Sequence, residues 1–149
     1  FSPYIWYPTP ITSVDIAKAV GPKRMKRLWP IKDAIDSGAL VVAGSDWPVV
    51  PSVNPWLGIE TLVTREKPGG EGEPINAGQR ITVEQALRIF TSNGAALMGR
   101  LDKGGTIEPG KLADIIILDR NPTKIPASEI HDTKVLKTYI GGEEVYSAD

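Results

Sequence analysis

Apolar positions recur at helical spacing along several parts of the chain. Between Pro30 and Gly38, the residues Ile31, Ala34 and Ile35 follow the period of an α-helix. A proline suits the first turn of a helix, and a glycine suits the left-handed position that ends one. The pattern therefore predicts a helix that starts after Pro30 and stops at Gly38.

A second helix is predicted from Thr82, because Thr82 and Gln85 have the spacing of a capping box. Its apolar face consists of Ala86, Leu87, Ile89, Phe90, Ala96 and Leu97. The run Ser92-Asn93-Gly94 contains poor helix formers, so we expect a kink or a break there and a stop at Gly99. Shorter helices are predicted around residues 14–20 and 57–65, and residues 67–78 are expected to form a loop.

The stretch 40–48, Leu-Val-Val-Ala-Gly-Ser-Asp-Trp-Pro, has a different pattern. Its consecutive apolar residues predict a buried strand that ends at a small-residue turn carrying Asp46. A helix followed by such a strand favours an α/β fold over an all-β fold. Catalytic groups in α/β folds lie at the carboxyl ends of strands.

After Gly104 the pattern changes, and it predicts a short strand and turn at residues 105–110 and a buried strand at residues 113–118. Residues 135–140 and 143–146, joined by Gly141-Gly142, predict a β-hairpin. A short strand is also predicted at residues 4–7. The carboxyl-terminal part should thus be a small β unit.

The amino-acid composition argues against several classes of partner and of catalytic site. The 17 basic and 18 acidic residues nearly cancel, which indicates neither nucleic acid nor an anionic membrane as a partner. No apolar run reaches the ~20 residues of a membrane span. We expect a soluble chain, with a cytoplasmic location favoured. The absence of cysteine excludes thiolate ligands and a cysteine nucleophile.

Asp46 is the main catalytic candidate, although an aspartate after a strand also commonly caps a turn. Trp47 and Trp56, in the proline-rich loop that follows, could form an apolar wall for a substrate, or could pack onto the body of the domain. His131 is the single histidine, and an isolated surface histidine is a poor metal ligand without convergent partners.

Three segments together resemble the amidohydrolase superfamily of metal-dependent hydrolases. Gly44-Ser45-Asp46-Trp47-Pro48-Val49 resembles the motif of its last barrel strand, and residues 82–96 resemble the helix that follows. Residues 104–114 resemble the return of the chain to the β-sandwich that flanks the barrel. Asn54–Ile59 and Thr64-Arg65 resemble the branch called amidohydrolase family 3, with YtcJ-like proteins.

The resemblance implies a carboxyl-terminal fragment of a β/α barrel, with its last two strands and helices in residues 1–103 and part of a composite β-sandwich in residues 104–149. It further implies hydrolysis of C–N bonds in a small amide-like substrate by metal-activated water. Asp46 would be both metal ligand and proton acceptor for a divalent ion such as zinc. The family's histidine ligands have no counterpart here, so the isolated chain is expected to be inactive and metal-free.

Two alternatives remain open at this point. The chain could be a non-catalytic binding or assembly module derived from an amidohydrolase, pairing its open edge with itself or with a missing barrel half. It could also be a truncated form of the complete enzyme.

Overall fold

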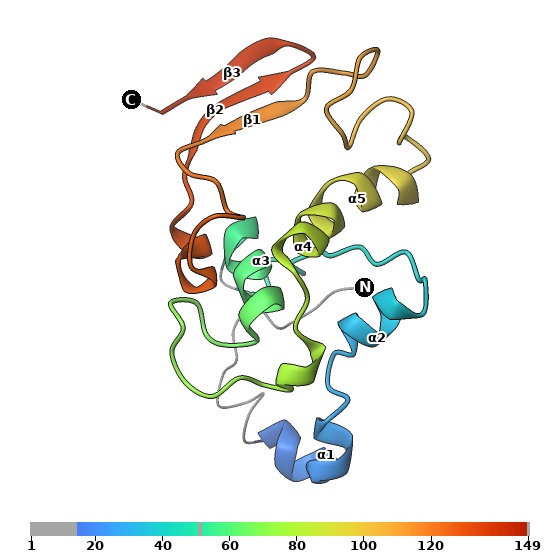
Figure 1. The fold of residues 1–149 in the computed structure, drawn as a ribbon, viewed down its shortest axis with the longest axis vertical. Coiled ribbons are helices and arrows are strands. Elements are labelled where there is room, and N and C mark those ends of the chain that lie inside the picture. Colours follow the sequence, from blue (N-terminus) through green and yellow to red (C-terminus); the bar gives the residue numbers. More distant parts are fainter. Residues whose placement is uncertain (1–14, 51, 149) are drawn as a thin grey trace.

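The computed structural model describes residues 15–50 and 52–148; the strand expected at residues 4–7 lies outside them. Helices come first along the chain and a β-sheet comes last (Figure 1). The elements in order are α1 (Ala17–Met25), α2 (Ile31–Asp36), α3 (Pro55–Thr64), η3 (Ala77–Gln79), α4 (Val83–Phe90), α5 (Ser92–Leu97), β1 (Ile115–Leu118), η4 (Ala127–Asp132), β2 (Val135–Ile140) and β3 (Glu143–Ser147).

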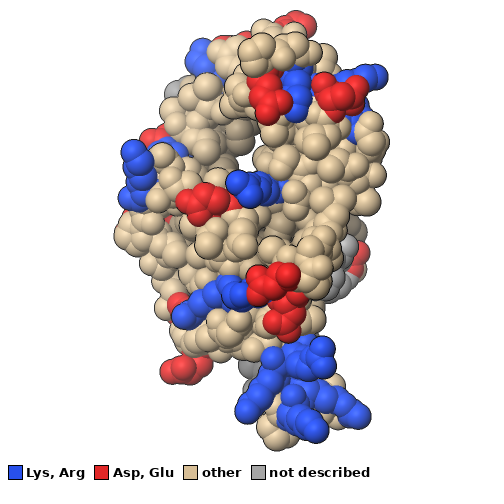
Figure 2. All heavy atoms as spheres, turned by 45° about the vertical axis from the view of Figure 1, so that its right-hand side comes forward, with Lys and Arg blue, Asp and Glu red and all other residues tan. Residues whose placement is uncertain are grey.

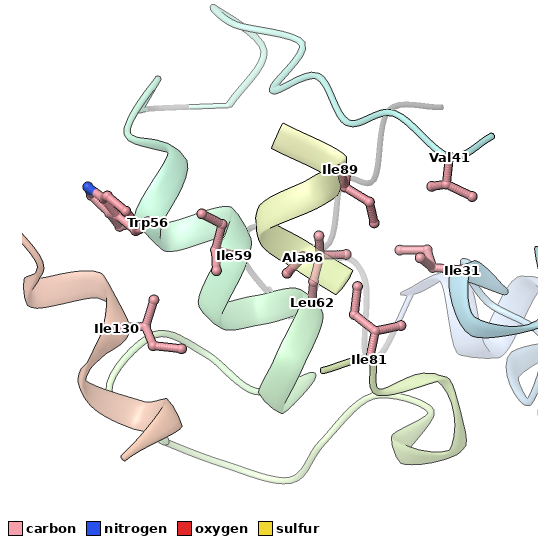
Figure 3. Close-up of a cluster of buried hydrophobic side chains, with 9 residues drawn as sticks. All are labelled: Ile31, Val41, Trp56, Ile59, Leu62, Ile81, Ala86, Ile89 and Ile130. Atoms are coloured by element: carbon pink, nitrogen blue, oxygen red, sulfur yellow. The ribbon is translucent and has the colours of Figure 1, made fainter. Parts of the chain in front are cut away.

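Helix α3 forms the centre of the hydrophobic core. Its residues Ile59 and Leu62 are 2% and 1% exposed, and α4, α2 and η4 contribute buried side chains around them. Figure 3 shows how these side chains converge between the elements. The cluster consists of Ile31, Val41, Trp56, Ile59, Leu62, Ile81, Ala86, Ile89 and Ile130. One core therefore joins segments from Ile31 to Ile130.

The predicted helix boundaries at α2 and α4 are confirmed. Helix α2 starts after Pro30, and Gly38 follows it with a φ of 81°. Thr82 and Gln85 form both hydrogen bonds of the capping box at the start of α4. These boundaries depend on contacts within a few residues, which explains why local sequence was sufficient to predict them.

The predicted break in the second helix is also confirmed, although it lies one residue earlier. Thr91 has φ −129° and ψ −94°, outside the helical range, and it separates α4 from α5. Helix α5 ends before Gly99, which has a φ of 65°. Helix α3 was expected at residues 57–65 and begins two residues earlier, at Pro55, with Asn54 as its N-cap.

The strand expected through Asp46 does not form. Residues 39–46 are not helical and pair with no strand in the described part of the chain. Val41 is buried, but Leu40 is 53% exposed, so the stretch is only partly covered. A strand requires a neighbour for its backbone groups, and apolar composition alone cannot supply one.

The described sheet has three antiparallel strands in the order β1-β2-β3. The hairpin predicted at Gly141-Gly142 is confirmed, with Ile140 paired to Glu143. Two predictions for this half of the chain are wrong in part. Residues 105–110 include the expected turn but no strand. The strand expected at residues 113–118 forms as β1, but it is not buried, since Ile116 and Ile117 are 47% and 44% exposed.

The sheet lies at the end of the molecule opposite α1 (Figure 1). It does not lie flat against the helices, and Figure 2 shows an opening between the two parts. Lys and Arg side chains gather over α1 at the other end (Figure 2). Although the net charge of the chain is only −1, positive charge is concentrated locally around α1.

Candidate active-site aspartate and its setting

Asp46 lies at the end of the segment 39–46, on the molecular surface. Its φ of 58° is left-handed, a conformation that aspartate tolerates better than most residues. A turn follows directly, in which the N–H of Val49 donates to the carbonyl of Asp46 at 2.9 Å. The Ser45 hydroxyl accepts a hydrogen bond from the N–H of Trp47 at 3.2 Å. The backbone thus turns tightly at Asp46, and this residue is exposed to solvent.

The two tryptophans of the following loop have opposite surroundings. Trp47 is 62% exposed next to Asp46, whereas Trp56 is 6% exposed and belongs to the core. The burial of Trp56 agrees with packing onto the body of the domain. Of these two tryptophans, Trp47 is the one whose side chain is open to solvent, and it directly follows Asp46 in the chain.

The described residues do not form a metal site. They contain no group of three or more His, Asp or Glu side chains that could hold an ion. Asp46 has a suitable ligand type, but one carboxylate does not complete a coordination shell. The residues present therefore do not fit a bound metal without further ligands.

His131 is part of a partly buried hydrogen-bond network rather than an isolated surface residue. It lies in η4, and its backbone N–H and Nδ1 are 2.7 and 2.8 Å from Oε2 of Glu60. Glu60 is fully buried in α3, and its Oε1 accepts the N–H of Gly69 at 2.7 Å. This network attaches η4 and the 66–72 loop to α3.

Arg65 is a second polar residue whose role the sequence did not reveal. It is fully buried, and its guanidinium donates to the carbonyls of Ile75, Trp29 and Leu28. Burial lowers the pKa of Arg65 to about 10, so the group still carries its charge at pH 7. Arg65 therefore joins the end of α3 to two other parts of the chain: residues 28–29, which precede α2, and residue 75, which precedes η3.

Asn93 is the third such residue, and it bears directly on the segment that carries Asp46. Its side-chain Nδ2 donates to the carbonyl of Val41 at 2.8 Å. Sequence patterns had indicated only that Asn93 is a poor helix former. A contact across 52 positions leaves no local signal that could have identified it.

No helix in the described residues has the length and apolarity required to cross a membrane.

Comparison with known proteins identifies the family. The profile of the amidohydrolase family matches residues 8–146. The chain is 34% identical over 116 residues to the N-substituted formamide deformylase of Arthrobacter pascens, covering 78% of this chain and 21% of that protein. It is 32% identical over 128 residues to the putative amidohydrolase YtcJ of Bacillus subtilis, covering 85% of this chain and 24% of YtcJ.

Solved structures agree. A metal-dependent hydrolase of unassigned activity from Pyrococcus horikoshii aligns with a TM-score of 0.68 and 27% identity, over 85% of this chain and 25% of that one. An amidohydrolase from Thermotoga maritima aligns with a TM-score of 0.60 and 26% identity, over 83% and 26% of the two chains. The chain thus spans about a quarter of the length of these relatives. It belongs to the amidohydrolase family, in the family 3 branch that includes YtcJ-like proteins.

Proposed function

We propose that this chain is the carboxyl-terminal part of a longer metal-dependent amidohydrolase, and that Asp46 is its catalytic carboxylate. The observation that carries the proposal is Asp46 itself, exposed at a tight corner of the segment whose motif marks the family. The matched relatives are about four times longer than this chain, since it covers 21–26% of them. Other parts of such a protein would complete the site.

The chemistry of Asp46 suits hydrolysis of a C–N bond. An ionised carboxylate can accept a proton from an attacking water and return it to the leaving amine. A divalent metal, zinc in our proposal, supplies Lewis acidity to such a site when bound. Because the described residues do not by themselves fit the metal, the isolated chain should have no hydrolase activity.

The substrate class is proposed from the neighbourhood of Asp46 and from one relative. The Arthrobacter protein carries the name of a deformylase of N-substituted formamides. Trp47, with 62% of its surface exposed, could lie against an apolar substituent on the nitrogen of such an amide. A formamide bearing an aryl group, such as formanilide, is therefore the first substrate to test.

We also propose a place in the complete protein for each of the two parts of the chain. Residues 1–103 would complete a β/α barrel, in which a neighbouring strand from elsewhere in the protein pairs with residues 40–46. Residues 104–149 would complete a β-sandwich. These assignments would provide a neighbouring strand for the segment 40–46 and a partner for the open sheet.

The first experiment measures the intact mass, the metal content and the formanilide hydrolysis of the protein expressed from the complete reading frame. We expect a mass several times 16.1 kDa, bound divalent metal and hydrolysis of formanilide. Asp46→Asn should lower kcat by about 10³-fold or more, as expected for loss of a catalytic carboxylate. Asp102→Asn, at another exposed aspartate, is the matched control and should leave kcat unchanged.

A non-catalytic assembly module is the second candidate, favoured by the exposed apolar side chains of the sheet, which include Ile116, Ile140 and Tyr146. A metal-free 16.1 kDa product of the complete reading frame would support it and refute the hydrolase proposal. Full activity of Asp46→Asn in a larger, metal-containing protein would instead refute only the role of Asp46.

A further inference from the structure

Val41 is a buried residue near the start of the segment that carries Asp46. Val41 is 6% exposed, and residues 39–46 pair with no strand in the described part of the chain. A buried carbonyl that lacks a hydrogen-bond donor is strongly unfavourable, so the Val41 carbonyl requires a partner from elsewhere.

Asn93 supplies that partner. Its Nδ2 lies 2.8 Å from the carbonyl oxygen of Val41. Asn93 is in the first turn of α5, four positions after the core residue Ile89 and beyond the break at Thr91. One side-chain amide therefore takes the place that the N–H of a neighbouring strand would have.

The first turn of α5 is itself held in place from another side. Gly105 has a φ of 85°, and a Cβ at this position would lie 2.6 Å from Cβ of Ala95 and 3.0 Å from Cα of Ser92. The backbone at Gly105 is thus in direct contact with the turn that carries Asn93. Movement of this turn in that direction is blocked.

We propose that Asn93 is a positioning residue for Asp46: its amide fixes the start of the segment whose other end presents the carboxylate. This inference rests on the proposed catalytic role of Asp46. Asn93 would act through the backbone from Val41 to Asp46 and would not contact the substrate. Its loss should shift Asp46 relative to the rest of the site, and displacements near 1 Å can cost about 10²-fold in rate.

Asn93→Asp tests the proposal in the protein from the complete reading frame, because it keeps the shape of the side chain but removes the N–H donor. Asn76→Asp is the matched control, since Nδ2 of Asn76 also donates to a backbone carbonyl, that of Leu28, at 3.3 Å. The readouts are hydrogen exchange of peptides covering residues 39–48, kcat and KM for formanilide, and the thermal midpoint.

We expect Asn93→Asp to increase exchange in residues 39–48 and to lower kcat by about 10- to 100-fold with little change in KM. Asn76→Asp should leave the exchange of residues 39–48 and the kcat near those of the original protein, even if its thermal midpoint falls. Asn93→Ser is the second variant, for use if Asn93→Asp does not fold. Its shorter side chain does not reach the Val41 carbonyl in the same way, so it should also increase exchange in residues 39–48 and lower kcat.

Unchanged exchange in residues 39–48 would overturn the proposal, as would equal losses of kcat in the Asn93 and Asn76 variants, which would indicate general destabilisation. Asp46→Asn in the same assay separates the two levels of inference. If Asp46→Asn is fully active, the catalytic role itself fails. If Asp46→Asn is inactive while Asn93→Asp is normal, only the positioning role fails. The exchange measurement does not depend on the substrate chosen.

Discussion

Arg65 shows how a single residue can join segments that are distant in the sequence. Its guanidinium has no described carboxylate partner and is bound by carbonyls at positions 28, 29 and 75. An uncompensated buried charge is costly, and hydrogen bonds to a charged donor offset part of that cost. In the sequence, Thr64-Arg65 was noted only as part of the resemblance to amidohydrolase family 3. Its burial depends on segments folded around it.

We expect Arg65→Met to lower the free energy of unfolding by about 2–4 kcal/mol, because it removes three hydrogen bonds from a charged donor and leaves the buried carbonyl of Ile75 without the donor described for it. Arg100→Met, at an exposed arginine, is the control and should change stability by less than about 0.5 kcal/mol. Urea unfolding of each variant measures the difference. Equal stability of the two variants would show that the Arg65 contacts contribute little.

At the scale of elements, local and non-local determinants separate clearly. The capping box at Thr82 and the stop at Gly38 were predicted because each depends on hydrogen bonds or backbone angles within a few residues. The strand through Asp46 was predicted from composition and did not form, because pairing depends on a second strand.

The contact between Gly105 and α5 provides a test at this scale. We expect Gly105→Ala to destabilise the protein by about 2–4 kcal/mol, because the methyl group would meet Ala95 and Ser92 and the backbone has a left-handed φ. Gly104→Ala is matched in residue type and neighbourhood, and its Cβ would have no atom within 4 Å. Thermal unfolding should distinguish them, and equal midpoints would contradict the packing described.

At the scale of the whole molecule, one face of the sheet carries the exposed apolar side chains of Ile116, Ile140 and Tyr146, and we call it the apolar face. Ile116, Thr138 and Tyr146 are cross-strand partners, and alternation places Ile140 on their side. On the opposite face, Ile117 pairs with Lys137, and Glu144 accepts hydrogen bonds of 2.7 and 2.8 Å from Lys137 and Tyr139. Contiguous exposed apolar residues of this kind mark a surface that another part of a protein covers.

We therefore expect the isolated 149-residue chain to associate with itself, as sedimentation velocity at increasing concentration would show. The double variant Ile116→Lys with Ile140→Lys should remain monomeric, because it places charges on the apolar face. Ile117→Lys lies on the opposite face and is the control, which should still associate. A monomeric parent chain at every concentration would contradict this account of the sheet.

The amino-acid sequence by itself indicated the family, the boundaries of α2 and α4, the final hairpin and Asp46 as a candidate, because motifs, caps and turns depend on neighbouring residues. Only the tertiary structure decided that Trp56 and Arg65 are buried, that His131 binds Glu60, and that Asn93 reaches Val41. These contacts join residues that lie far apart along the chain. Their existence depends on how the core brings α3, α5 and η4 together, and no local pattern carries that information.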